Sequence, residues 1–459
     1  MDVLALVSHE FLSSVAGEVG GCCPVSPEEM DRLQALARSQ SELKRIPGGS
    51  AANVMKGLAH LVPGDVECRF MGMVGCDATG AEYREKLALQ GVSPLLLTST
   101  SAAPSACALC LVTPDGQRTM RTCLGASLEL QAASQLPSSW AEGCRLLHCE
   151  GYCLYRPALT SEVMRAAKQQ GALVAMDLAS FELVRSCQSS LVQLLETGCL
   201  DLVFANQEEA AALAEVLHLT PPDAAHDDKV DAAQTFLLQH IQVSVVSKGP
   251  QGCQARARDG RRGRSPAAGV KVVDTIGAGD CFTAGFLAAF LQGAAGDLDA
   301  CSKAGCAAGA QAVQTQGAEL APATWTSLQA DIRACIASAA AQQPVTSSLL
   351  TAPLPPMPQP VGQEQGQQEG QGQQEGQGQQ EGQGQQEGQG QQEGQGQQEG
   401  LLGHGNGGSS AQKELRAQSA KTGNSACTGT STEQAAGSDS VMDMAGAAAG
   451  AHQVLVGPV

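Results

Sequence analysis

Two patterns of hydrophobic and polar positions alternate along residues 1–338. Short apolar runs typical of buried strands recur throughout, and segments with a helical period of three to four residues separate many of them. Strands are expected at 3–7, 68–75, 105–113, 118–124, 144–150, 171–179, 200–206, 243–249 and 269–274. Helices are expected at 51–61, 77–90, 160–170, 207–216, 229–240, 278–293, 298–315 and 323–338. This alternation predicts a mostly parallel sheet that is covered by helices on both faces.

Two local signals refine this picture. A further helix is expected after Ser26, where Pro27 fits the first helical position and Glu29 completes a capping-box pattern. The turn sequence Pro-Asp-Gly at 114–116 lies between two strand-like runs and predicts a hairpin. That hairpin interrupts the alternation, so we expect a small β extension beside the main sheet.

The pattern ends near residue 340, and the last part of the chain is of another kind. From 365 to 400 the hexapeptide QGQQEG repeats in tandem, and it offers no apolar side chain to bury. The flanking stretches are rich in Pro, Gly and Ser. We therefore expect one folded domain over 1–338 and a disordered low-complexity tail over 339–459, whose removal leaves fold and activity intact.

Composition and charge narrow the class of protein. The net charge of −18 argues against partners such as nucleic acids or anionic membrane surfaces. No apolar run reaches the roughly 20 residues of a membrane span. The 18 cysteines come without a secretory signal, which indicates free thiols and a reducing, cytoplasmic location. Cys107 and Cys110 form a CxxC, but without a second pair the spacing does not predict a metal site.

The stretch VVDTIGAGDCFTAGF at 272–286 carries the strongest chemical signal. Gly277 and Gly279 allow close backbone approach, and the helix that follows directs unpaired N–H groups at whatever lies above the turn. Asp280 falls in the first turn of that helix. From the residues alone, a capping aspartate and a general base beside a phosphoryl group are both compatible with this position.

A second glycine turn opens another predicted helix, at PGGSAANVMKGLAHL (47–61). Gly48 and Gly49 let backbone approach a polar ligand, and Asn53 is placed to bind its hydroxyls, although an ordinary polar residue also fits there. Known phosphate motifs are absent from the sequence. There is no GxxxxGK[ST], and Phe282 stands where a GxGxxG would need glycine.

These motifs, in this order, resemble the ribokinase-like sugar kinases of the PfkB carbohydrate kinase family. The resemblance rests on Gly48-Gly49 with Asn53, on GMVGCDATG at 72–80 and on DTIGAGDCFTAGF at 274–286. The stretches DLASFELVR, DLVFANQEEAA and GQRTMRTCL are similar to a plant and algal adenosine-kinase-like branch. The resemblance implies a three-layer α-β-α sandwich with a small β lid, acting as a monomer or homodimer. It also implies transfer of the ATP γ-phosphoryl group to a hydroxyl of a sugar or nucleoside, with Mg²⁺.

The resemblance also implies roles for individual residues. Asp280 matches the catalytic base, and the anion hole corresponds to Gly277, Ala278 and Gly279. Substrate binding corresponds to Gly48, Gly49, Asn53 and the lid residue Arg121. Nucleotide binding corresponds to Asn206, Glu209, Ser247 and Gly249, with Glu209 organising Mg²⁺ through water, and a K⁺ site corresponds to Asp274 and Thr275.

Each role has a structural alternative. Asn206 and Glu209 also fit a simple helix cap, Arg121 also fits a solvated strand position, and His9 and His148 are expected to be structural.

One position departs from the family pattern. The first strand of these kinases usually ends in an aspartate that holds sugar hydroxyls, and the sequence places Ser8 there, with Glu10 close by. The leading hypothesis is still an active kinase, because Asp280 lies in a full signature and both glycine turns are present. One alternative is a non-catalytic regulator that binds sugar or nucleotide on the same fold, and a weaker one is a scaffold whose repeats recruit partners.

Overall fold

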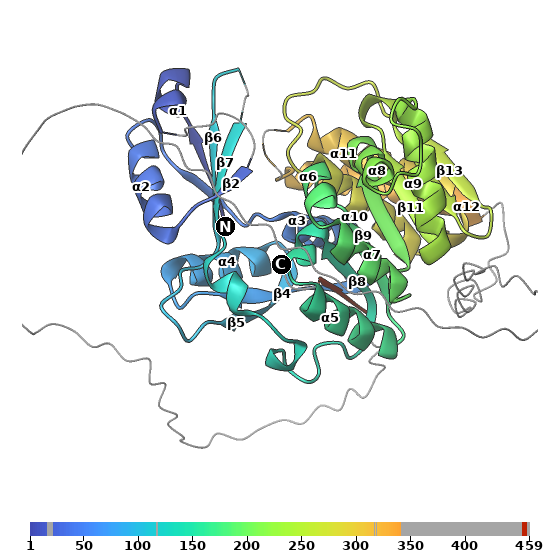
Figure 1. Ribbon diagram of the computed structural model, residues 1–459, viewed down its shortest axis with the longest axis horizontal. Coiled ribbons are helices and arrows are strands. Elements are labelled where there is room, and N and C mark those ends of the chain that lie inside the picture. Colours follow the sequence, from blue (N-terminus) through green and yellow to red (C-terminus); the bar gives the residue numbers. More distant parts are fainter. Residues whose placement is uncertain (16–21, 116–117, 316, 318, 341–451, 457–459) are drawn as a thin grey trace, which may run out of the picture. The chain divides into compact units, whose positions relative to one another are not determined.

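The computed structural model describes residues 1–15, 22–115, 118–315, 317, 319–340 and 452–456 (Figure 1). These residues form a large and a small sheet with helices around them. Short 3-10 helices connect some elements: η1 (Gly125–Glu129), η2 (Ala133–Gln135), η3 (Gly151–Tyr155), η4 (Gly249–Gln251) and η5 (Ala294–Gly296). Among the described residues, no helix combines the length and apolar character needed to cross a membrane.

The large sheet has nine strands, and all neighbours from β11 to β5 run parallel. Two antiparallel strands, β12 and β13, extend it at the other edge. In spatial order the strands are β13 (Arg262–Ser265), β12 (Cys253–Ala257), β11 (Val243–Ser247), β10 (Leu202–Asn206), β9 (Leu173–Asp177), β8 (Cys144–Glu150), β14 (His452–Val456), β4 (Val66–Val74) and β5 (Val92–Thr98).

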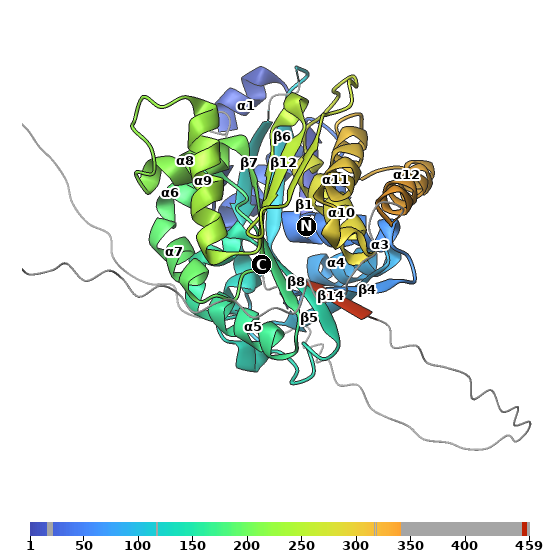
Figure 2. The same ribbon diagram turned by 90° about the vertical axis from the view of Figure 1, so that its right-hand side faces the viewer.

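Both faces of this sheet are buried, because successive side chains of each strand enter different cores. In β10, Phe204 packs into one hydrophobic cluster and its neighbour Val203 into the other. The helices of the first face are α3 (Ser50–Leu61), α4 (Ala78–Leu89), α10 (Ala278–Leu291), α11 (Leu298–Ala312) and α12 (Pro322–Ala340). Those of the second are α5 (Pro157–Gln169), α6 (Phe181–Ser186), α7 (Gln188–Glu196), α8 (Gln207–Val216) and α9 (His226–His240). The predicted three-layer sandwich is thus confirmed (Figure 2).

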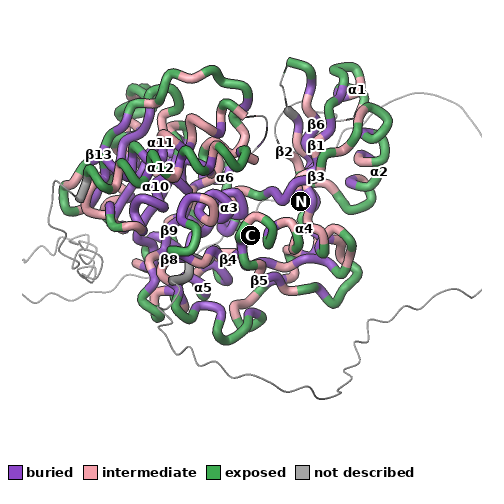
Figure 3. Tube along the Cα trace, turned by 180° about the vertical axis from the view of Figure 1, so that it is seen from behind, coloured by how far each residue is buried: buried purple, intermediate pink, exposed green. Residues whose placement is uncertain are grey.

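The helix α3 is unusual in being buried along most of its length, as the purple tube in Figure 3 shows. It packs against α10 and β4, and small residues permit the close approach. A Cβ added to Gly57 would come within 2.6 Å of the Ala284 Cβ in α10. The two glycine turns of the sequence open these two packed helices, so their amino ends are held together.

The small sheet has five strands: β2 (Cys22–Pro24), β7 (Arg118–Cys123), β6 (Cys107–Val112), β1 (Asp2–Leu6) and β3 (Lys44–Ile46). Helix α2 (Pro27–Ala37) packs on β6 and β7, and α1 (His9–Val15) follows β1. Ser26 caps α2 by accepting from the Glu29 N–H at 3.2 Å, as expected. The Glu29 side chain instead binds Arg32, so the second half of the expected capping box is wrong.

Most predicted elements are confirmed to within a few residues, but two expectations are wrong. No strand forms at 269–274, where Val272 and Val273 are 58% exposed and no neighbouring strand pairs with them. The expected tail also contains a strand, because His452–Val456 forms β14 inside the large sheet. The rest of the expected tail, 341–451 and 457–459, lies outside the described residues, as does part of the predicted hairpin turn.

Candidate active site

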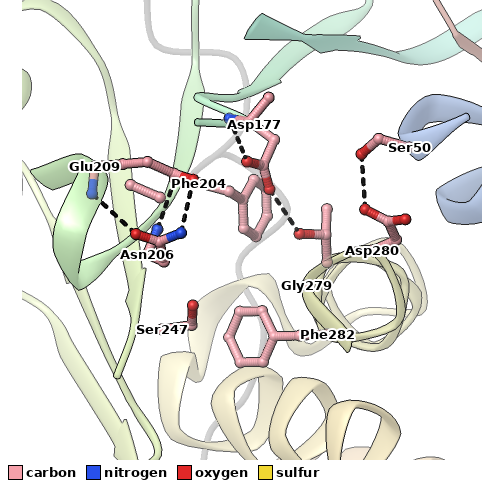
Figure 4. A pocket seen from close by; sticks show the side chains of 12 residues that line it. Ser50, Asp177, Phe204, Asn206, Glu209, Ser247, Gly279, Asp280 and Phe282 are labelled. Atoms are coloured by element: carbon pink, nitrogen blue, oxygen red, sulfur yellow. Dashed lines mark hydrogen bonds between the residues drawn. The ribbon is translucent and has the colours of Figure 1, made fainter. Parts of the chain in front are cut away.

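A cavity of about 140 Å³ lies at the carboxyl ends of β9, β10 and β11, facing the start of α10 (Figure 4). Ligands of parallel α/β sheets usually bind at this edge, because strand ends and helix amino ends converge there. The cavity is lined by Ser50, Asp177, Ala179, Phe204, Ala205, Asn206, Glu209, Ser247, Gly279, Asp280, Phe282 and Thr283. Of the predicted site residues, the structure therefore brings Asn206, Glu209, Ser247, Gly279 and Asp280 together.

The amino end of α10 forms one wall of the cavity. Gly277 caps the helix in the left-handed region, with a φ of 70°, which glycine adopts at no steric cost. Gly279 lines the cavity, and a Cβ added there would meet no atom within 4 Å. The open space beside Gly279 leaves the helical N–H groups accessible to an anion.

Asp280 is held by two donors from the first turn of α3. The Ser50 hydroxyl donates to Oδ1 at 2.7 Å, and the Asn53 amide donates to Oδ2 at 2.8 Å. Burial raises the pKa of Asp280, and these two hydrogen bonds oppose the rise. Asp280 therefore does not cap its own helix, which removes the structural alternative weighed from the sequence.

Two further carboxyl groups line the same cavity. Asp177 accepts from the Thr283 hydroxyl at 3.2 Å, a bond drawn in Figure 4. Burial, together with the charge of Glu150, raises the pKa of Asp177 to about 7. Burial and the charge of Asp177 raise the pKa of Glu209 to about 8. Several acidic groups thus share a small space, an arrangement that a cation would relieve.

Asn206 and Glu209 form a reciprocal cap at the start of α8. The Asn206 side chain accepts from the Glu209 N–H at 2.9 Å, and Glu209 accepts from the backbone and side-chain amides of Asn206 at 2.8 and 2.7 Å. The expected capping role is therefore present. Ser247 is the register partner of Asn206 on β11, so the ends of both strands face the cavity.

The glycine turn at Gly48 and Gly49 encloses a residue that sequence reasoning missed. A Cβ at Gly48 would overlap the carboxylate of Asp2. Burial raises the pKa of Asp2, and the backbone N–H of Gly49 opposes the rise. Gly49 itself has a φ of 98° and caps α3. Buried Lys56 fixes the turn by donating to the Pro47 carbonyl at 2.6 Å.

Asp2 corrects the expectation about Ser8. Strand β1 lies in the small sheet, and its first residue, Asp2, meets the glycine turn. Ser8 is exposed and accepts from the Phe11 N–H, as a residue before α1. The structure therefore places the side chain of Asp2, and not that of Ser8, beside the glycine turn.

Asn53 has a second feature that bears on ligand binding. Its Nδ2 donates to Asp280, but its Oδ1 is buried and has no hydrogen-bond partner in the structure. A buried acceptor without a donor is costly unless a ligand supplies the donor.

Beneath the cavity lies a buried pair that the sequence did not connect. His148 and Glu150 are 0% and 1% exposed, and their side chains meet at 2.9 Å. Burial lowers the pKa of His148 to about 4, and burial together with Asp280 raises the pKa of Glu150 well above its usual range. Burial thus disfavours the charged form of both side chains, and the two are held together at hydrogen-bond distance. This contact gives His148 the buried partner that its expected structural role requires.

Other predicted residues do not line this cavity. Arg121 is buried in the small sheet at 5% exposure, where it donates to the Met120 carbonyl. Gly249 has a φ of 52° in η4. Asp274 accepts from the Ile276 and Gly317 N–H groups and so ties two loops together.

Sequence signals for the missed cavity residues do exist. Ser50 lies between the glycine turn and Asn53, and Asp177 ends an apolar run that was expected to be a parallel strand. The carboxyl end of such a strand is where binding residues gather, so Asp177 could have been named from its position.

The donor set around the cavity fits Mg²⁺ in part. Carboxylates such as Asp177 and Glu209 supply the oxygen ligands that this ion prefers. Among the described residues, however, no three His, Cys, Asp or Glu side chains form a ready metal cluster.

Comparisons with known proteins agree with this geometry. Residues 25–325 match the model of the pfkB family carbohydrate kinases. The chain is 28% identical to probable fructokinase-7 of Arabidopsis thaliana over 53% of this chain and 70% of that protein. It is 23% identical to adenosine kinase 2 of the same plant over 69% of this chain and 92% of that protein.

A solved structure gives the same picture. Adenosine kinase from Sinorhizobium meliloti superposes with a TM-score of 0.60 at 28% identity, covering 72% of this chain and 96% of that one. The family match spans more than half of the sequence and contains both glycine turns and Asp280. The chain therefore belongs to the pfkB family of carbohydrate kinases.

Proposed function

We propose that this kinase uses Asp280 to deprotonate a hydroxyl of a sugar or nucleoside bound between the glycine turn and the cavity. The deprotonated oxygen attacks the γ-phosphorus of ATP, the bond to the bridging oxygen breaks, and ADP leaves. Asp280 keeps the proton. The open amino end of α10 stabilises the charge on the transferred group.

The position of Asp280 carries this proposal. It stands in the first turn of α10, so the base and the anion-binding backbone share one helix end. Its oxygens already accept from Ser50 and Asn53, and each can accept one more donor such as a substrate hydroxyl. A pKa raised by burial suits a base that works near neutral pH.

Substrate hydroxyls have three polar partners beside the glycine turn. Asn53 Oδ1 lacks a donor, Asp2 offers a carboxylate, and the backbone is uncovered at Gly49, where a Cβ would meet no atom within 4 Å. We assign Asp2 the role of the family aspartate that the sequence aligned with Ser8. With Asp2 in place, the hypothesis of a non-catalytic regulator loses the observation that supported it.

Ions and nucleotide complete the proposal. Mg²⁺ would be held near Asp177 and Glu209, mainly through water, and would neutralise charge on the phosphates when bound. ATP would contact Ser247, which lines the cavity, and Gly249, which lies outside it. A K⁺ ion near Asp274 and Thr275 and a lid contact from Arg121 remain predictions.

Location and assembly are also part of the proposal. Sixteen cysteines between Cys23 and Cys335 are free thiols, which suits a reducing compartment such as the cytoplasm. We expect a monomer or a homodimer.

A kinase assay with a panel of sugars and nucleosides tests the assignment. Asp280→Asn is expected to lower kcat by about two to four orders of magnitude, the usual contribution of a positioned base. The Asp280→Asn variant should still bind a non-hydrolysable ATP analogue with Mg²⁺, and a thermal-shift assay measures this binding.

The matched control is Asp65→Asn, an exposed aspartate that binds Gln292. It should turn over at the wild-type rate. Equal turnover by Asp280→Asn and wild type on the best acceptor would refute the catalytic role.

A further inference from the structure

The middle of the large sheet is completed by a segment from the far end of the chain. Strand β14 pairs in parallel with β4, from His452 opposite Val66 to Val456 opposite Phe70. It also pairs in parallel with β8, where Val456 lies opposite His148. In the described sheet β4 and β8 meet only through β14.

The folded protein would be less stable if no strand lay between β4 and β8. The other edges of β4 and β8 are already occupied by β5 and β9, so neither strand could find a new partner without breaking an old pairing. Strands in a sheet are spaced by about 4.8 Å, so the slot has the width of a single strand. Without β14, the backbone N–H and C=O groups of β4 and β8 that face the slot would be buried and unpaired.

The slot suits the sequence of this segment. It lies between β8, where Leu146 and Leu147 are fully buried, and β4, where Phe70 is 5% exposed. Strands buried on both faces are continuous apolar runs, and residues 454–456 read Val-Leu-Val. The QGQQEG repeats that precede it contain nothing comparable.

We propose that the slot between β4 and β8 is a strand-acceptor surface whose occupant is the segment His452–Val456 of the same chain. The covalent connection through 341–451 gives this segment an effective concentration that a free strand from a second molecule lacks. Strand β8 ends at Glu150, which is close enough to Asp280 for the two charges to interact, so occupation of the slot also supports the strand end next to Asp280.

Proline substitution tests the pairing in the full-length protein. Val454→Pro removes a backbone donor inside a central strand, whereas Val454→Ala keeps it. The proline variant should melt several degrees lower, and the amides of β4 and β8 should exchange at least about tenfold faster than in the alanine variant. Unchanged exchange in β4 and β8 would overturn the proposal, whatever the activity of the enzyme.

Cross-linking tests the occupant even where the proline variant fails to fold. Val454 lies opposite Cys68 in the register, so Val454→Cys sets two thiols side by side. Diamide would oxidise them to a disulfide and be reduced itself, and peptide mapping should find 454 joined to Cys68 within one chain. Val441→Cys, outside β14, serves as the control and should not link to Cys68. A link between two chains, or none, would refute the assignment to the same chain.

This outcome is independent of the proposed chemistry. Stability, exchange and cross-linking report on the strand alone. The Asp280→Asn assay reports on catalysis in a protein whose strand is unchanged. Failure of one therefore does not imply failure of the other.

Discussion

At the scale of single residues, the site depends on which polar atoms have partners. Asp280 is satisfied by Ser50 and Asn53, whereas Asn53 Oδ1 is buried without a donor. The first observation fixes the side chain of the proposed base, and the second leaves an acceptor for the hydroxyl of the proposed substrate. Asp2 adds a carboxylate beside the glycine turn, where substrate binding was expected.

Asp2→Asn tests this assignment at the substrate side. The change keeps the shape of the side chain but removes the charge that strengthens a hydrogen bond to a hydroxyl. Hydrogen bonds to charged groups contribute about 1.5–3 kcal/mol, so KM for the acceptor should rise roughly 10- to 100-fold with a smaller effect on kcat. Steady-state kinetics with varied acceptor at saturating ATP measures it.

Ser8→Ala is the matched comparison, because the sequence aligned Ser8 with the family's substrate-binding aspartate. Ser8 is exposed, so its KM should equal that of wild type. A raised KM for Ser8→Ala together with a wild-type KM for Asp2→Asn would instead assign the role to Ser8.

At the scale of elements, glycine has two different roles at the amino end of α10. Gly277 is needed for its backbone conformation, with a φ of 70°. Gly279 has no such φ, and its missing side chain leaves the cavity open. The same substitution at these two positions should therefore act on different properties.

Gly277→Ala is expected to lower the free energy of unfolding by about 1–2 kcal/mol, the penalty for a left-handed conformation. Gly279→Ala should keep or raise stability by up to about 1 kcal/mol, because alanine favours a helix over glycine. Its methyl group faces the cavity, so turnover should fall at least about tenfold. Chemical denaturation and the kinase assay compare the two, and an equal loss of stability in both variants would contradict the distinction.

At the scale of the whole molecule, the last residues of the chain are tied to the kinase unit. Residues 452–456 pair inside the large sheet, so we propose that the region after α12 is not dispensable as a whole. The earlier expectation that all of it can be removed now applies only to the stretch before β14.

Replacing 341–446 by a Gly/Ser linker of about 30 residues is expected to preserve both activity and melting temperature, since β14 is retained. Removing 341–459 should lower Tm and expose β4 and β8 to exchange. Thermal melting and the kinase assay on both proteins provide the comparison. A full truncation as stable and active as wild type would show that β14 is dispensable.

The shared acidic groups predict how stability depends on pH. The pKa values of Asp177 and Glu209, about 7 and about 8, lie above the usual values near 4. At pH values between the usual and the raised pKa, the folded protein holds protons that the unfolded chain has released. The free energy of unfolding should therefore fall as pH rises from about 5 to 8.5. Mg²⁺ with an ATP analogue should offset the loss, because a cation favours the ionised carboxylates.

Thermal melts across this range check the slope. Asp177→Asn and Glu209→Gln should flatten it, since each removes one shifted group. A Tm that rises with pH in the unliganded protein would contradict the burial of these carboxyl groups.

The sequence by itself determined what local chemistry encodes. Strand and helix periods gave the sandwich, and the glycine turns with Asn53 and Asp280 gave the family. These signals are short-range, because each depends on residues that are neighbours in the chain. Motifs at the starts of helices can be recognised in the sequence for the same reason.

Only the tertiary structure decided which distant residues meet. It moved the first strand into the small sheet and so put Asp2, rather than Ser8, at the glycine turn. It also paired β14 with β4 and β8, although their residues lie hundreds of positions away in sequence. Strand pairing is set by sheet edges and burial in three dimensions, and five residues after a polar repeat carry no local mark of the strands they join.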